Sequence, residues 1–407
     1  MSNERSVAGR VERVCADVSP AAYSRRPHVM LIVETALAYG RAVVQGISRY
    51  LIANQPWSLY VDLRELMAEP PDWLDNWRGD GVISRSTTPE LADKLTRLGV
   101  PTVDLNDIYG KLGLPHVWTD HQAVGRLAAA HLLDRGFRNF AYCGFTGHHW
   151  SSLRRDGFGD ELRRAGCDCR IFESPWETSK ANSWEQQQDA LGVWLAKLPK
   201  PVGVMCCNDL RGQQTLDACR RRELFVPEAV AVIGVDNDEV LCALCDPPLS
   251  SVVPNAERVG YEAAALLDRL MQGERSESSE ILIAPRGIET RQSSDVLAID
   301  DPLVAAAVKC IRERACRGLT VAEVLRQIPL SRSMLEKRFR RYLQQTPQEA
   351  IRSVQIKRVK QLLLETDLPL EAISRLAGFK HVEYMSVVFK RETSQTPGRF
   401  RRESQVS

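Results

Sequence analysis

Long apolar runs are missing from this 407-residue sequence, and none approaches the roughly 18 uninterrupted apolar residues that a membrane-spanning helix needs. The first 20 residues mix acidic and basic side chains without an apolar centre, so they lack the pattern of a secretory signal. A glycine-rich phosphate loop and the serine turn of the hydrolases are also absent. These absences disfavour a membrane protein, an exported protein and several enzyme classes, and we expect a cytoplasmic location.

The 11 cysteines do not form a recognised metal motif. Cys242 and Cys245 have the two-residue gap of a zinc knuckle, but no convincing second pair accompanies them. Cys206 and Cys207 lie within an apolar segment that is typical of a strand. We therefore expect buried free thiols and no metal.

The composition, 44% hydrophobic and 26% charged, is that of a globular protein with room for more than one core. Residues 1–26 are expected to be a mobile tail. From residue 27 to 292, short aliphatic runs alternate with amphipathic helical segments, which predicts parallel sheets covered by helices. The alternation starts again at His121, so we expect two lobes of like construction with a cleft between them.

The last hundred residues repeat one pattern, a short amphipathic helix followed by a break and a second helix that becomes basic. In the first copy, the segment 321–328 has the spacing of a helix with one buried face, Pro329 ends it, and Ser331 can cap the next helix. In the second copy, Gly378 is the turn residue. The inner face of this copy is expected to contain Leu370, Ile373, Leu376 and Ala377. Residues 303–402 therefore predict an all-α domain with two helix-turn-helix units.

We expect the second helix of each unit to enter a major groove, with its first side chains at base edges and its later cations at phosphates. The segment 347–365 predicts a helix that could hold the two units about 34 Å apart, one turn of DNA. We call the second helix of each unit its reader helix, or reader. The apolar residues expected on the inner side of the first reader are Met334, Leu335, Phe339 and Tyr342. The candidate DNA-contacting residues are Arg332, Ser333, Glu336, Lys337 and Arg340 in the first reader, and His381, Val382, Glu383, Ser386 and Lys390 in the second.

Charge is distributed unevenly along the chain. Residues 302–402 carry 21 Lys and Arg against 9 Asp and Glu, while the remainder carries 33 against 43. Basic side chains often only solvate helix faces, but here the excess coincides with the doubled unit. This coincidence favours binding to nucleic acid.

This region resembles the DNA-binding domain of the AraC/XylS family of transcription regulators. Its closing segment, KRETSQTPGRFRR, is similar to that family's end signature. The places of that signature are filled by Phe389, Lys390, Thr396, Pro397, Phe400 and Arg401. The resemblance implies a double-stranded DNA operator as partner, with RNA polymerase as a further candidate.

The segment 27–291 resembles the ligand-binding domain of the lactose-repressor and ribose-binding-protein superfamily. DHQAVGRLAAAHLLDRGFRNFAYCGF and VAVIGVDNDEVLCALCDPPLSSV carry the resemblance, together with the Arg-x-x-Gly-Phe string that begins at Arg154. The order of the two modules resembles one group in particular, the xylose operon regulators. The fold implied is a two-lobed, periplasmic-binding-protein-like α/β domain followed by the helical domain.

A sugar site needs carboxylates, amides and a forked guanidinium in fixed places, and aromatic faces against the C–H surface. By resemblance, Arg154 grips the sugar, Asp236 is the carboxylate of an opposite strand end, and Asn208 or Asp209 lies between them. In the first lobe Asn106 and Asp107 stand where the family usually has Asp and then Arg. The candidate stacking residues are Tyr39, Trp118 and Trp150. Each candidate also has a structural alternative, because Asn and Asp often cap helices and Trp often packs in a core.

The sequence therefore predicts a sugar-responsive transcription regulator without a cofactor, expected to be a homodimer and an activator of pentose genes. Xylose is the first candidate effector. Residues 293–302 are expected to form a short linker that transmits lobe rotation, and 403–407 a tail. Two alternatives remain at this point, a constitutive DNA-binding protein whose first domain only dimerises, and a sugar-acting enzyme with a DNA-binding tail.

Overall fold

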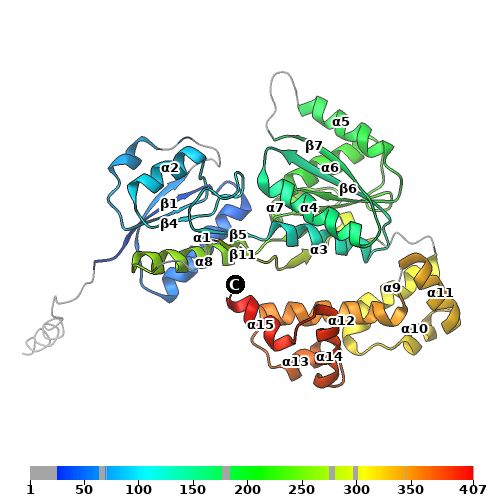
Figure 1. Cartoon of the computed structure of the whole chain (residues 1–407). Coiled ribbons are helices and arrows are strands. Elements are labelled where there is room, and N and C mark those ends of the chain that lie inside the picture. The colour runs from blue at the N-terminus through cyan, green and yellow to red at the C-terminus, as the bar shows by residue number, and fades with distance from the viewer. Residues whose placement is uncertain are drawn as a thin grey trace, which may run out of the picture.

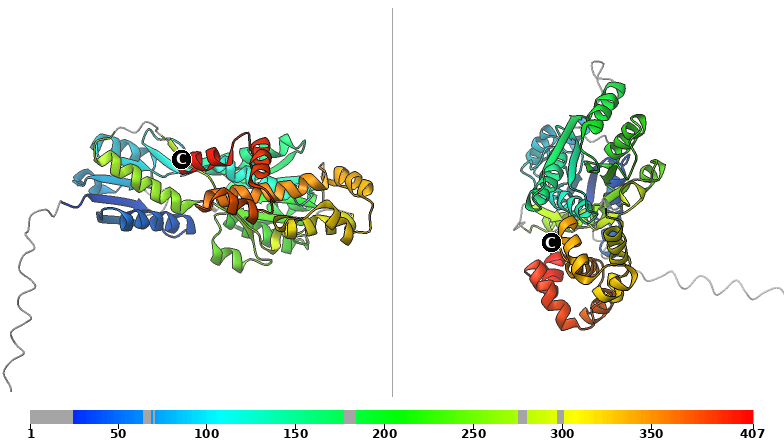
Figure 2. Two further views of the ribbon diagram at one scale, coloured as in Figure 1. Left: turned by 90° about the horizontal axis from the view of Figure 1, so that it is seen from below. Right: turned by 90° about the vertical axis from the view of Figure 1, so that its right-hand side faces the viewer.

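The computed structural model describes residues 25–63, 69, 71–176, 184–274, 280–296, 301–343 and 345–406. Two α/β lobes lie side by side, and a helical domain extends beneath the second lobe and reaches the edge of the first (Figure 1). Views from below and from the side place this helical domain against one side of the lobes (Figure 2). The expected N-terminal tail lies outside the described residues except for its last two, Arg25 and Arg26.

The first lobe is a parallel sheet with helices on both faces. Its strands, in spatial order, are β11 (Glu280–Ile283), β5 (His116–Thr119), β4 (Thr102–Asp104), β3 (Gly81–Ser84), β1 (His28–Val33) and β2 (Ser58–Leu63). One face packs on α1 (Ala38–Ala53) and α8 (Ala256–Met271), and the other on α2 (Pro89–Leu98) and the 3-10 helix η1 (Asp72–Asn76). Strand β1 is almost wholly buried because interior parallel strands are covered on both sides.

The second lobe repeats this construction. Its strands, in spatial order, are β12 (Gly287–Glu289), β10 (Ser250–Val253), β9 (Val230–Val235), β8 (Val202–Cys206), β6 (Asn139–Thr146) and β7 (Cys169–Pro175). All pairings are parallel except that of β12 with β10. One face packs on α3 (His121–Leu133) and α4 (His149–Arg164), and the other on α5 (Trp184–Lys197), α6 (Asp209–Arg221) and α7 (Glu239–Leu244).

The chain passes between the lobes at residue 120, at 254–255 and at 284–286. The expected new round of alternation from His121 is confirmed by α3 and the strands that follow it. Helix α8 and strand β11 then return to the first lobe, so each lobe is built from segments that are far apart in the sequence.

Helices α3 and α4 approach each other closely because glycines stand at their contact. A Cβ atom added at Gly157 would lie 2.2 Å from the carbonyl oxygen of Gln122, and one added at Gly125 would lie 2.2 Å from that of Arg154. Only glycine allows backbones this close together. The glycine of the Arg-x-x-Gly-Phe string thus fixes the height at which Arg154 sits over the sheet.

The helical domain contains two helix-turn-helix units on either side of a long helix (Figure 1). Its elements are α9 (Pro302–Arg314), η3 (Ala315–Arg317), α10 (Val321–Gln327), α11 (Arg332–Leu343), α12 (Pro347–Glu365), α13 (Leu370–Leu376), α14 (Val382–Thr393) and α15 (Pro397–Val406). Thr320 and Thr346 start α10 and α12 through capping boxes, in which each threonine exchanges hydrogen bonds with a glutamate three residues later. The first unit is α10 and α11, and the second is α13 and α14.

Gln355, at the middle of α12, joins the two units. Its side chain is 1% exposed and its Nε2 donates to the carbonyl oxygens of Ala315 and Gly378, each at 3.0 Å. Gly378 has φ 77°, and a Cβ there would come within 2.6 Å of the Ala315 oxygen. The spacing of the two reader helices is therefore set by a packed and hydrogen-bonded joint.

Two expectations about buried faces were wrong. Leu376 is 48% exposed, because the buried stripe of α13 is narrow and runs through Ile373 to the C-cap residue Ala377. Met334 is 43% exposed, whereas Leu335 and Phe339 fill the core beneath α11. Both exposed side chains follow from helical geometry, because the residue before a buried position faces about 100° away from it.

The segment expected as a linker begins inside the second lobe. The Ser293 hydroxyl donates to the carbonyl oxygen of Val232, and Ser294 contacts His131 through a hydrogen bond of 2.9 Å. Residues 297–300 lie outside the described residues, and Asp301 caps α9. At the other end, α15 continues through Val406, into the expected tail. None of the described helices is long and apolar enough to span a membrane.

Candidate functional site

The carboxyl ends of strands from both sheets face a cleft between the lobes. A cavity of about 340 Å³ opens there, and Tyr39 and Arg41 of the first lobe line it together with Asp236 of the second. Asn255 and Arg286, from two of the crossing segments, complete its wall. In parallel sheets this position is where ligands bind.

In the first lobe a buried arginine is held between two carboxylates. Arg85 places its Nε 3.1 Å from Oε1 of Glu34 and its Nη1 3.4 Å from Oδ2 of Asp107. The guanidinium also lies 4.3 Å from the ring centroid of Tyr39, whose hydroxyl is 2.8 Å from that of Thr119. Burial opposes ionisation of Asp107, but Arg85 and the other neighbouring basic groups hold its pKa below the usual value. Asp107 is therefore an anion in the cleft.

In the second lobe Arg154 has the matching role. Its Nη2 donates to Oδ1 of Asp236 at 3.2 Å and its Nη1 to the carbonyl oxygen of Cys207 at 2.5 Å. The guanidinium lies 4.8 Å from the ring centroid of Trp150. Asp236 has φ 105°, an unfavourable backbone conformation for a residue with a Cβ, and such strain is commonly kept at functional sites.

His121 connects the two groups. Its Nδ1 accepts a hydrogen bond of 3.3 Å from Nε of Arg154, and its Nε2 is 3.8 Å from Oδ2 of Asp107. Burial, and then the charge of Arg154, lower the pKa of His121 well below its usual value, so the ring is neutral with the proton on Nε2. This buried Nε2 has no hydrogen-bond partner among the described residues. Charged groups of both lobes thus meet around this buried polar donor.

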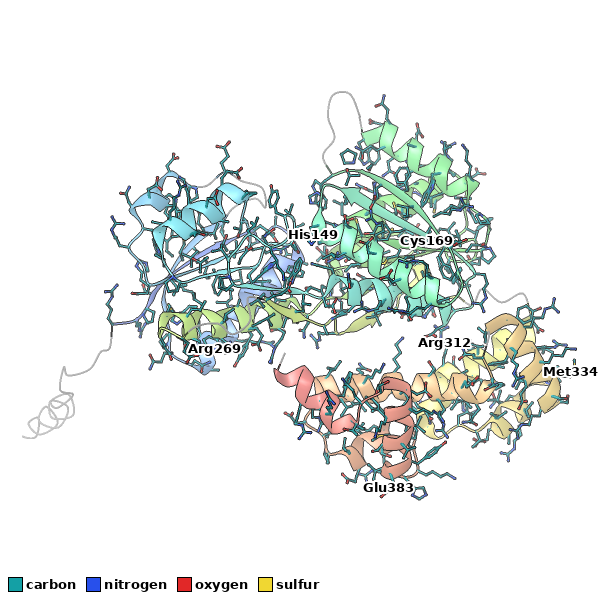
Figure 3. All side chains as sticks on the ribbon, viewed as in Figure 1. His149, Cys169, Arg269, Arg312, Met334 and Glu383 are labelled. Carbon is teal, nitrogen blue, oxygen red and sulfur yellow. The ribbon has the colours of Figure 1, made fainter. Side chains whose placement is uncertain are left out.

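The lobes also touch through the start of α4. The backbone nitrogens of His149 and Trp150 donate to the carbonyl oxygens of Ile108 and Asp107, at 2.9 and 3.0 Å. The His149 ring is stacked on Trp118 with centroids 5.7 Å apart, and Figure 3 places His149 at the boundary between the lobes. The helix N-terminus therefore closes one side of the cleft.

Three of the predicted amide and carboxylate ligands have their polar groups engaged in hydrogen bonds that support loops and helix ends. Asn106 uses its oxygen for the backbone nitrogens of residues 108 and 109, and its nitrogen for Asp104 and for the Gly110 carbonyl. Asn208 caps α6, accepting from the Arg211 nitrogen at 2.9 Å. These amides hold the loops that carry the site, as the structural alternative for strand-end residues anticipates.

Asp209 is the third residue of this kind. Its Oδ1 accepts from the Ser251 hydroxyl at 2.6 Å, and its Oδ2 accepts from the backbone nitrogen of Asp238 at 2.8 Å. Burial, and then the charge of Asp236, raise the pKa of Asp209 to about 7. Trp118 likewise donates its indole N–H to Oε1 of Glu280 at 3.0 Å.

Four cleft residues were not among the predicted ones, namely Glu34, Arg85, His121 and His149. Glu34 and Arg85 directly follow β1 and β3, so the strand-end rule that selected residues 106, 208 and 236 could have found them. His121 and His149 begin α3 and α4. No sequence signal tells that the ends of these helices lie in the cleft.

The candidate DNA-contacting residues lie on the outer side of α11 and along α14, from its N-cap His381 to Lys390 in its last turn. Arg332, Ser333, Lys337 and Arg340 are exposed, and Glu336 is half-buried and paired with Arg332 at 3.0 Å. On α14, His381, Glu383 and Lys390 are exposed, while Val382 and Ser386 are half-buried. Figure 3 shows Glu383 on the side of the domain away from the lobes, with Met334 at its outer end.

A two-lobed α/β domain with a charged cleft, joined to a basic domain with paired helix-turn-helix units, defines a ligand-responsive DNA-binding regulator. Family models agree with each part. A XylR N-terminal domain matches residues 28–118, a periplasmic binding protein-like domain matches 129–294, and a helix-turn-helix domain matches 324–403.

Known proteins match nearly the whole chain. The xylose operon regulatory protein of Haemophilus influenzae is 32% identical over 381 residues, covering 92% of this chain and 97% of that protein. The one of Escherichia coli K12 is 32% identical over 389 residues, with 93% and 98% covered. A solved structure, described as the xylose-binding transcription activator xylR, matches with a TM-score of 0.60 and 30% identity over 93% of this chain and 99% of that chain.

The chain belongs to the family of xylose operon regulatory proteins. It is a sugar-responsive, DNA-binding transcription regulator, and its relatives are regulators and not enzymes.

Proposed function

We propose that a pentose, with D-xylose as the first candidate, is the effector and binds in the cleft between the lobes. The observation that carries this proposal is the junction of Arg154, His121 and Asp107, where polar groups of both lobes surround an Nε2–H that has no hydrogen-bond partner in the described ranges. The names of the two relatives and of the solved structure support xylose as the sugar.

Vicinal sugar hydroxyls both donate and accept, so they suit this mixture of groups. Asp107 and Asp236 would accept from the sugar, while Arg154 and the Nε2 of His121 would donate to it. Arg85 is a proposed addition to this set, because it lies beside Asp107 and Tyr39. The proposed stacking surfaces are Tyr39, Trp118 and Trp150. Asn106, Asn208 and Asp209 are proposed to support the site and not to contact the sugar.

Sugar binding would change transcription by changing how the helical domain lies on the lobes. Arg138, just before β6, donates from its Nη2 to the carbonyl oxygen of Tyr342 in α11, so the second lobe and the first reader unit touch directly. A ligand can shift such an arrangement only through different affinities for its two states. We propose activation of pentose genes by a homodimer on paired operator sites, in the cytoplasm, with RNA polymerase as a further partner.

The proposal is tested with two neighbouring arginines on α4. Arg154→Lys keeps a positive charge but loses the forked geometry that binds Asp236 and the Cys207 carbonyl. Arg155→Lys is the matched control, since Arg155 pairs with Glu173 at 3.1 Å on the outer side. Titration calorimetry with D-xylose, L-arabinose, D-ribose and D-glucose should show binding of at least one pentose by the wild type and Arg155→Lys, and weak or no binding by Arg154→Lys.

Operator binding is measured in parallel, by fluorescence anisotropy with and without the pentose. A sugar that binds but leaves operator affinity and transcription unchanged would contradict the coupling. If none of the three pentoses binds the folded wild type, the proposed effector class is wrong.

A further inference from the structure

A second polar cavity lies between the second lobe and the helical domain, away from the sugar cleft. It has a volume of about 270 Å³ and is lined by His131, Asp134 and Arg135 from the end of α3. Arg312 of α9 and Lys357 of α12 face it from the other domain. Figure 3 shows Arg312 in the space between the lobe and the helical domain.

Among the described residues that line this cavity, three side chains are basic and one, that of Asp134, is acidic, so positive charge exceeds negative charge. Within the described part of the chain, no hydrogen bond and no ion pair is formed by Arg312 or Lys357, although the charge of Asp134 acts on both and that of Asp295 acts on Arg312. These two cations belong to the basic domain but face the lobe, so the recognition helices of the same domain cannot present them to DNA.

Arg135 is oriented by the lobe itself. Its Nε donates to the carbonyl oxygen of Ser294 at 2.7 Å, and its Nη1 donates to Nδ1 of His131 at 3.1 Å. Burial, followed by the charge of Arg312, lowers the pKa of Arg135 to about 9. Burial, followed by the charge of Arg135, lowers the pKa of His131 well below its usual value. Burial is the largest cause of both shifts and the neighbouring positive charge adds to it, while Asp295 and Asp134 act on Arg135 in the opposite direction.

We propose that this cavity binds a phosphate dianion held by Arg135, Arg312 and Lys357, as a second effector site that joins the sugar-binding and DNA-binding domains. A guanidinium fork binds phosphate oxygens in pairs, and a lysine adds a point charge. The cavity is smaller than the roughly 300 Å³ of typical drug-sized pockets, which suits a phosphate group or a small phosphate ester. Polar side chains of Gln345 and Ser353 also line it.

The dianion would hold the two domains together, because its ligands come from α3 on one side and from α9 and α12 on the other. Because the dianion would bind only the folded protein with the two domains in contact, it should raise the melting temperature of the protein. This inference does not depend on which sugar fills the cleft.

The test compares inorganic phosphate, ribose 5-phosphate and chloride at equal ionic strength, by thermal melting and by titration calorimetry on the full chain. Phosphate or the ester should raise the melting temperature of the wild type, and chloride should not. Tighter binding of ribose 5-phosphate would identify the ligand as a phosphate ester, and tighter binding of inorganic phosphate would identify it as the free anion. Lys357→Gln and Arg312→Gln should each raise the dissociation constant about tenfold or more, the loss of one charge-assisted hydrogen bond.

Two controls separate this site from other effects. Lys309→Gln removes an exposed lysine of α9 that does not line the cavity, and it should bind phosphate as the wild type does. Arg154→Lys should lose the sugar response and keep the phosphate response. The proposal is overturned if phosphate and its ester act no differently from chloride, or if Lys357→Gln and Lys309→Gln respond to phosphate alike.

Discussion

Substitutions at Gly157 and Gly159 test how the sugar site is positioned. The two glycines lie two residues apart on α4, but the first is packed against α3 and the second faces open space. A Cβ at Gly157 would lie 2.2 Å from the Gln122 oxygen and 2.7 Å from its Cα, both backbone atoms that cannot rotate away. A Cβ at Gly159 would have no atom within 4 Å. The two substitutions by alanine therefore share their effect on helix propensity and differ in packing alone.

The expected magnitudes follow from this difference. Gly159→Ala should raise the free energy of unfolding by up to about 1 kcal/mol, the propensity difference between alanine and glycine in a helix. Gly157→Ala has the same gain but must separate α3 from α4, and overpacking of this kind costs about 1–3 kcal/mol or more. Because backbone atoms are involved, we expect a net loss of about 2 kcal/mol. Arg154 would move with α4, so sugar affinity should fall as well.

Urea unfolding followed by circular dichroism gives the two free energies, and calorimetry gives the sugar dissociation constants. The two free energies are compared only if the unfolding curves have equal m-values, since a changed m-value would mean that the unfolding transition itself has changed. Equal stability and equal sugar affinity of the two variants would refute the reasoning, because the helix contact would then tolerate a side chain.

Two other predictions concern DNA binding and pH. Lys337→Ala should change operator sequence preference, whereas Arg340→Ala should weaken all sites alike and reduce the salt slope by about one, as measured by anisotropy over a salt series; identical behaviour would refute the division of roles. The pKa of Asp209 is raised to about 7 from its usual 3.8, so its neutral form contributes stability that is fully present below about pH 4 and lost as pH rises through 7. The free energy of unfolding of Asp209→Asn should therefore improve relative to that of the wild type as pH rises from about 4 to 7, as measured by urea unfolding at each pH. A difference between the two proteins that does not change with pH would contradict the raised pKa.

The sequence and its family resemblance named several of the residues that meet between the lobes, and they missed others. Arg154 and Asp236 were both predicted as sugar-binding residues, and the structure brings their side chains within 3.2 Å of each other. The roles of Asn106 and Asp209 could not be settled, because a strand-end amide or carboxylate looks the same in sequence whether it binds a ligand or a backbone nitrogen. Glu34 and Arg85 were overlooked although they follow strands in the same way.

The sequence by itself determined the local elements, namely the strand and helix alternation, the second round from His121, and the two helix-turn-helix units in a basic domain. These depend on residues within a few turns of each other, so periodicity and capping residues are enough to specify them. The tertiary structure decided the rest. It returned α8 and β11 to the first lobe, brought Asp107 of one lobe to His121 beside Arg154 of the other, and left Arg312 and Lys357 facing the second lobe. The physical reason is that these meetings depend on how the sheets, crossing segments and domains pack over long sequence distances, and no local pattern records that packing.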